Sequence, residues 1–91
     1  MIVVKTKKGV QKIDLKNVKR YKQEVEEVLK DEKLLEESLY EFIKSMPFDK
    51  VYTFTGEVTK EELLKEIEHK TEKYRHMLEV YRKMLEEMVH G

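Results

Sequence analysis

The 91-residue chain carries 19 basic and 19 acidic side chains, so its formal net charge is zero. This length suits one domain with a single modest core and is too short to enclose a large cofactor. Because the chain contains no cysteine, disulfides, thiolate nucleophiles and zinc fingers are excluded. No apolar run approaches the roughly 18 residues of a membrane span, and the first residues lack the apolar segment of a signal peptide. We therefore expect a cytoplasmic protein with no membrane contact.

The charges are unevenly distributed along the chain. Residues 1–22 hold eight basic side chains and a single acid, Asp14, and therefore carry a formal charge of +7, which residues 23–91 balance with −7. Such polarisation attracts polyanions to the basic end or favours pairing with a second copy. The abundance of Glu and Lys, together with the absence of alanine, is typical of thermophile proteins.

Two short β-branched segments, residues 2–6 and 10–15, begin the chain. They are separated by Lys7-Lys8-Gly9, in which the glycine can adopt a positive φ. The pattern predicts a basic β-hairpin over residues 1–16. Asn17 follows as the expected N-cap of a helix.

Residues 17–46 form an apolar heptad pattern that ends before Pro47 and has Glu32 as its only polar member. One interpretation is a continuous helix of nearly thirty residues. The other is a break at Lys30-Asp31, with Asp31 capping a second helix. A third β-prone segment, residues 51–55, ends at Gly56 and needs a partner strand.

The third strand helps to choose between these two interpretations. A straight helix over residues 17–46 would hold its ends about 45 Å apart, too far for strand 51–55 to reach the N-terminal hairpin. We therefore favour the break, with strand 51–55 adding to the hairpin. In the unbroken case this segment pairs with another subunit or forms a loop.

The longest predicted element is a single amphipathic helix over residues 59–89, about 45 Å long. Thr59 and Glu62 form a capping box at its start, and the apolar heptad that follows is interrupted only by Thr71. Because this length exceeds the roughly 30 Å diameter of a globule of this size, we expect a second copy to cover the apolar face. The predicted oligomer interface consists of Leu64, Ile67, Tyr74, Leu78, Tyr81, Leu85 and Met88.

Two sets of residues on the helices allow alternative interpretations. Glu32 and Thr71 either form a buried polar layer that sets helix register, or Glu32 lies in the solvated first turn of a helix, which we favour. Tyr74 and Tyr81, with their neighbouring methionines, form either a ligand groove or part of the core. We favour the core, with the tyrosine hydroxyls at its rim.

Candidate catalytic and metal-binding residues do not assemble into a site. His69, His76 and His90 occupy the outermost heptad position, with about 10.5 Å of helix per heptad, so one metal ion does not bridge them. Ser38 and Ser45 have no histidine in register, and the glycines are too far apart for a phosphate loop. The sequence therefore predicts no catalytic residue, no metal site and no cofactor.

Together these features predict a single helix-dominated α+β domain, residues 1–91, with the element order ββααβα. The predicted function is a non-enzymatic interaction module that homo-oligomerises through residues 59–89. The alternative is a nucleic-acid-binding regulatory protein whose dimer presents the basic hairpin, and a third is an adaptor that docks on another protein. The residues expected to contact nucleic acid are Lys5, Lys7, Lys8, Lys12, Lys16, Lys19 and Arg20.

Overall fold

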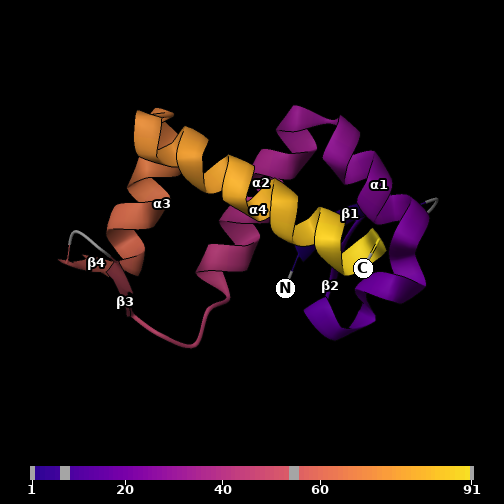
Figure 1. Ribbon diagram of the computed structural model, residues 1–91, viewed down its shortest axis with the longest axis horizontal. Helices are drawn as coiled ribbons and strands as arrows, with labels where there is room; N and C mark the ends of the chain where they lie inside the picture. Colours follow the sequence, from indigo (N-terminus) through magenta and orange to yellow (C-terminus); the bar gives the residue numbers. More distant parts are fainter. Residues whose placement is uncertain (1, 7–8, 54–55, 91) are drawn as a thin grey trace.

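The computed structural model describes residues 2–6, 9–53 and 56–90, and a long C-terminal helix crosses the front of the molecule in Figure 1. The elements are β1 (Ile2–Thr6), β2 (Gly9–Ile13), the 3-10 helix η1 (Leu15–Tyr21), α1 (Lys22–Lys30), α2 (Glu32–Lys44), β3 (Lys50–Thr53), β4 (Gly56–Thr59), α3 (Lys60–His69) and α4 (Glu72–His90). This order confirms the predicted helix-dominated α+β fold, with an N-terminal hairpin, a second small strand pair and a long C-terminal helix. No helix among the described residues has the length and apolarity needed to cross a membrane.

The N-terminal β-hairpin forms as predicted. β1 pairs antiparallel with β2, and the last pair before the turn joins Thr6 to Gly9. Gly9 has a φ of +103°, a backbone conformation that residues with a Cβ rarely adopt. Glycine at this position therefore fixes where the chain reverses.

The prediction that strand 51–55 adds to this hairpin is wrong. β3 pairs with β4 instead, so the described strands form two separate two-stranded sheets. The sequence Thr53-Phe54-Thr55-Gly56 repeats the Thr-x-x-Gly arrangement of the first turn, and Gly56 has a φ of +119°. Gly56 thus reverses the chain rather than ending a lone strand. Phe54 and Thr55 lie outside the described residues.

The 3-10 helix η1 replaces the predicted start of an α-helix at Asn17. Asp14 occupies the N-cap position, and Asn17 lies within the helix, where its N–H donates to the Asp14 carbonyl at 2.9 Å. Apolar residues recur every third position at Leu15, Val18 and Tyr21, which matches the three residues per turn of a 3-10 helix. The period of three, rather than a cap at Asn17, determines this segment.

The predicted helix break at Asp31 is confirmed. The Asp31 carboxylate accepts hydrogen bonds from the N–H groups of Lys33 at 3.1 Å and Leu34 at 3.2 Å, so it caps α2. Glu32 lies exposed in the first turn of α2, which confirms the solvated interpretation of this residue. The break turns α2 back onto α1, and both pack against β1.

The prediction of one continuous helix over residues 59–89 is wrong. α3 begins as expected, with the N–H of Glu62 donating to Thr59 Oγ1 at 3.2 Å, but it ends at His69. The next residue, Lys70, is its C-cap and adopts the left-handed conformation (φ 52°, ψ 49°). Thr71 then accepts a hydrogen bond from the N–H of Tyr74 at 3.3 Å and donates one to Glu66 Oε2. Thr71 is therefore the N-cap of α4 and not a member of a continuous apolar seam.

Lys60 holds the connection between α2 and α3 in place. Its backbone N–H donates to the Asp49 carbonyl at 2.8 Å. Its ammonium donates to the carbonyl of Lys44 at 3.2 Å, at the end of α2 where carbonyls lack helical partners, and to the carbonyl of Met46 at 2.5 Å, just beyond the helix. The second hairpin is thereby fixed next to α3, away from the first hairpin (Figure 1).

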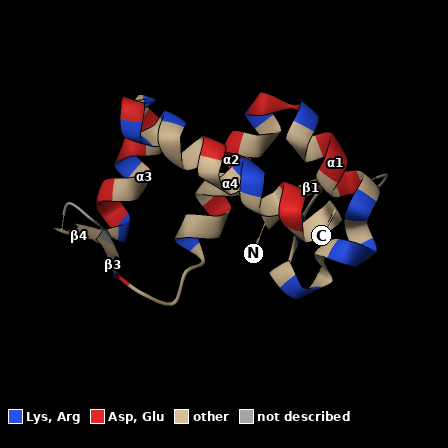
Figure 2. Ribbon diagram, viewed as in Figure 1, with Lys and Arg blue, Asp and Glu red and all other residues tan. Residues whose placement is uncertain are grey.

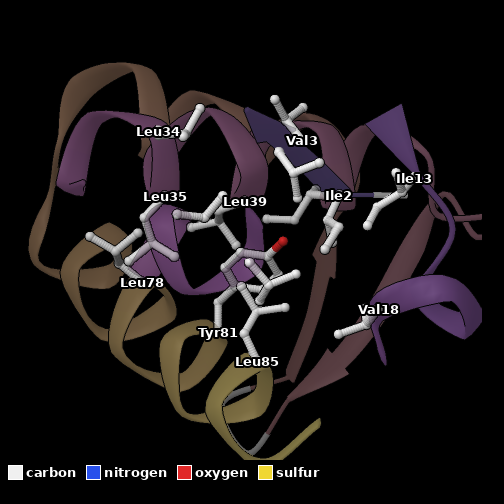
Figure 3. Close-up of a cluster of buried hydrophobic side chains, with 14 of the residues drawn as sticks. Ile2, Val3, Ile13, Val18, Leu34, Leu35, Leu39, Leu78, Tyr81 and Leu85 are labelled. Carbon is white, nitrogen blue, oxygen red and sulfur yellow. The ribbon is translucent and has the colours of Figure 1, made fainter. Parts of the chain in front are cut away.

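The hydrophobic core lies between β1 and the helices. β1 packs against α1 and α2, and α4 packs against η1, α1 and α2. Figure 3 shows side chains of these elements pointing toward one another, with the Tyr81 hydroxyl in their midst. The side chains with the least solvent exposure in this core include Ile2, Val4, Val18, Val25, Val28, Leu35, Ile67 and Leu85.

Candidate interaction surfaces

The residues predicted to form the oligomer interface lie mainly in the core of the single chain. Five of the seven, Ile67, Tyr74, Leu78, Tyr81 and Leu85, are at most 5% exposed. Leu64 and Met88 are partly buried against the same core. A second copy has no access to the five buried side chains while α4 keeps this position. Self-association through α4 therefore requires other residues of this helix.

Tyr81 and Ser38 form a polar contact inside the core. Their hydroxyl oxygens are 2.5 Å apart, and the N–H of Val3 donates to Ser38 Oγ at 3.3 Å. Burial raises the pKa of Tyr81 well above its usual value. The favoured assignment of Tyr74 and Tyr81 to the core is confirmed, but the Tyr81 hydroxyl is buried rather than at the rim. Ser38 is likewise fully buried and is not presented to a substrate.

Tyr74 lies at the edge of the core, near the carboxylates of α2. Burial raises its pKa, and a hydrogen bond to Glu36 and the negative charges of Glu36 and Glu32 raise it further. Tyr74 and Glu36 therefore connect α4 to α2, and the arrangement supports a structural role.

An apolar stripe on α4 remains accessible to solvent. Val80 is 55% exposed, and Met77 and Met84 beside it are partly buried. Lys73 and Glu87 are exposed and lie seven residues before and after Val80. Since seven residues make about two helical turns, Lys73, Val80 and Glu87 lie along one side of α4.

A groove adjoins this stripe in the elbow between α3 and α4. It has a volume of about 610 Å³, and its apolar lining comes from Val58, Leu63 and Met77. Charged side chains, including Lys73, surround it. Met77 lines the groove and also belongs to the stripe, so the apolar surface continues from α4 toward α3.

The structure gives the predicted nucleic-acid-binding residues different surroundings. Lys12 Nζ lies 3.1 Å from Glu41 Oε2, so its charge is partly compensated within the chain. Lys16, Lys19 and Arg20 are exposed on η1, and Lys22 is exposed at the start of α1. Figure 2 shows basic residues gathered on this part of the ribbon. Lys7, Lys8 and the side chain of Lys5 lie outside the described residues.

The histidines do not form a cluster. His69, His76 and His90 are all exposed, and His90 Nε2 lies 3.7 Å from Glu26 Oε1. Within residues 2–6, 9–53 and 56–90, no three His, Cys, Asp or Glu side chains are placed to hold a metal ion together.

Two features of these surfaces were not predicted from the sequence. The three-residue spacing of the exposed Lys16, Lys19 and Lys22 follows from the period of three in Leu-Lys-Asn-Val-Lys-Arg-Tyr-Lys, which a search for heptads overlooks. The exposure of Val80 is less evident from the sequence, where Val80 is an apolar residue on the otherwise polar side of α4.

Comparisons with protein-family models, curated proteins and solved structures found no match to this chain.

Proposed function

We propose that the protein is a small non-enzymatic assembly module that forms a homodimer by antiparallel pairing of α4 with α4 of a second copy. The observation that carries this proposal is the exposed apolar side chain of Val80, at the centre of a stripe with opposite charges at its two ends. Apolar side chains at the centre and charged groups at the rim are the usual arrangement of a protein interface.

The charges favour one orientation of the two helices. In an antiparallel pair centred on Val80, Lys73 faces Glu87 of the second copy, and the same contact recurs on the other side of the two-fold axis. In a parallel pair, Lys73 would face Lys73 and Glu87 would face Glu87. The stripe is therefore electrostatically complementary to itself only in the antiparallel arrangement.

The apolar contact has room to extend beyond the stripe. Met77 and Met84 lie close to Val80, and methionine side chains adapt to irregular surfaces. At the elbow, Leu63 on α3 and Val58 on β4 continue the apolar surface. This extension supports a contact wider than one pair of helices.

Charge exchange tests the pairing directly. Lys73→Glu or Glu87→Lys alone places like charges opposite each other, whereas the double variant restores two attractive pairs. Since exposed ion pairs contribute about 0.2–1 kcal/mol each, we expect each single variant to raise the dimer Kd roughly 2- to 30-fold and the double variant to restore it. Analytical ultracentrifugation measures these constants.

A mixture of the two single variants gives the sharpest readout. The glutamate introduced by Lys73→Glu in one chain then faces the lysine introduced by Glu87→Lys in the other, so the heterodimer is expected to form more strongly than either homodimer. Glu86→Lys is the matched control because Glu86 is exposed, adjacent in sequence and on a different side of α4. A wild-type protein that stays monomeric, or equal weakening by all three substitutions, would contradict the proposed pairing.

A further inference from the structure

We infer that the outer side of η1 is a nucleic-acid-binding site in which Lys16, Lys19 and Lys22 contact successive phosphates of one strand. The site is formed by η1 and the start of α1 of a single chain, so it does not require a second copy, although it adjoins the α4 stripe at Glu87. Its ligand is defined by the chemistry of a phosphodiester backbone, which DNA and RNA share.

The 3-10 geometry aligns Lys16 with Lys19, and Lys22 continues the three-residue spacing after Tyr21, where the backbone (φ −113°, ψ 37°) passes from η1 to α1. Side chains three residues apart eclipse one another in a 3-10 helix, with about 6 Å between them along the axis. This spacing is similar to the separation of neighbouring phosphates along a nucleic-acid strand. In an α-helix the same three residues would spread over about 120° of the surface. Lys16 and Lys19 lie within η1, and Lys22 follows as the first residue of α1.

The core holds this row in position. Val18 is 2% exposed, and Leu15 and Tyr21 are partly buried against the core, so one row of η1 faces inward. Each of the three lysines comes directly after one of these apolar residues in the sequence, and all three lysines are exposed. The backbone under the lysines is therefore anchored, which lowers the entropic cost of aligning them with a ligand.

The lysines also have few neighbours that neutralise them. Among the described residues, no carboxylate lies within ion-pairing distance of Lys16, Lys19, Lys22 or Arg20, in contrast to Lys12. Arg20, on the adjacent row, adds a fourth exposed cation. Glu87 lines a hollow with Lys16 and Lys19, so the ligand is expected on the side of the row that faces away from α4.

Lysine contacts to phosphates predict binding with little sequence preference and strong salt dependence. Each phosphate neutralised contributes about 0.9 to the slope of log K against log salt concentration for duplex DNA and about 0.7 for single strands. Three contacts therefore account for a slope of about 2.7 or 2.1, respectively.

Fluorescence anisotropy with labelled single-stranded RNA and duplex DNA tests the site, using the full chain at salt concentrations between about 50 and 200 mM. The variant Lys16→Gln, Lys19→Gln, Lys22→Gln is expected to lose at least about tenfold in affinity at low salt, and its slope is expected to fall by about 2–3. The control Lys33→Gln, Lys65→Gln, Lys83→Gln removes the same charge from exposed sites on α2, α3 and α4. We expect the control to keep the wild-type slope to within about one unit.

Several outcomes separate this site from general charge attraction. Lys19→Gln alone is a milder change, and circular dichroism checks that the variant folds. It should lower the slope by about 0.9 for duplex DNA or about 0.7 for single-stranded RNA, the contribution of one phosphate contact. Absence of binding at low salt, or equal losses in the two triple variants, would overturn the inference. Binding to phosphatidylserine vesicles without binding to nucleic acid would also overturn it. A protein that is monomeric but binds RNA would contradict the dimer and support this site.

Discussion

Ser38, Tyr81 and the backbone of Val3 meet in the core from three different elements. Among the described strands, β1 has a partner on one side only, so a buried N–H on its other side requires another acceptor. Ser38 Oγ accepts this hydrogen bond and also contacts the Tyr81 hydroxyl. The three groups therefore satisfy one another where no solvent is available. Sequence periodicity places Tyr81 on the apolar face but does not reveal a contact 43 residues away.

Tyr81→Phe tests the contribution of this hydroxyl. At neutral pH we expect the substitution to lower the free energy of unfolding by about 1 kcal/mol, because Ser38 loses a hydrogen-bond partner. Burial raises the pKa of Tyr81 in the folded state above the value of about 10 expected in the unfolded chain. As the pH rises above about 10, the unfolded state therefore loses its proton first, and the wild-type protein loses stability that Tyr81→Phe retains.

Urea unfolding of both proteins at neutral pH and near pH 10.5 measures this effect as the difference between their free energies of unfolding. The difference should shrink at the higher pH. A difference that stays constant across this range would mean that Tyr81 ionises equally in both states.

At the scale of the elements, the sequence predicted the boundaries that side chains encode. Asp31 and Thr59 are typical N-caps, and both accept the expected hydrogen bonds. The end of α3 has no such signal, since Lys70 is an unusual residue for the left-handed conformation and the apolar spacing continues past it. The pairing of β3 with β4 does not follow from the pattern, because a glycine after a β-prone segment marks the end of a strand as readily as a turn between two strands.

Substitutions at Lys70 distinguish the broken helix from a continuous one. Because Lys70 has a positive φ, Lys70→Gly is expected to raise the free energy of unfolding by about 0.5–1 kcal/mol. In a continuous helix the same change would lower it by about 1 kcal/mol. The ion pair between Lys70 and Glu36 is long, at 3.9 Å, and the Lys70 side chain is exposed, so its loss has little effect.

Lys70→Ala is the matched control, because it removes the same lysine without allowing the positive φ more easily. We expect it to be no more stable than the wild-type protein in thermal or urea unfolding. Glycine less stable than alanine at this position would contradict the observed break.

At the scale of the whole molecule, the sequence identified an apolar face on the C-terminal segment but not the surface that covers it. The break at Asp31 folds α2 back onto α1 and β1, and these elements then cover Leu78, Tyr81 and Leu85. A heptad pattern has the same form whether its partner is the same chain or a second copy. In the fold, elements of the same chain cover the apolar face of α4, and Val80 remains as the exposed apolar residue of this helix.

Leu78→Asp and Val80→Asp place the same charge on the buried side and on the exposed side of α4, at positions only two residues apart. Leu78 is 4% exposed, so Leu78→Asp buries an unpaired charge and is expected to cost several kcal/mol, a large part of the stability of a small domain. Val80 is 55% exposed, so Val80→Asp should leave the fold intact and prevent dimer formation.

Circular dichroism during heating reports on the fold, and analytical ultracentrifugation reports on the assembly. We expect Leu78→Asp to lose the cooperative transition and Val80→Asp to retain it as a monomer. A folded, monomeric Leu78→Asp variant would show that the side of α4 that contains Leu78 contacts a second copy rather than the core of its own chain. A dimeric Val80→Asp variant would move the interface away from the α4 stripe. The pair therefore tests the intramolecular core and the proposed assembly surface with a single type of substitution.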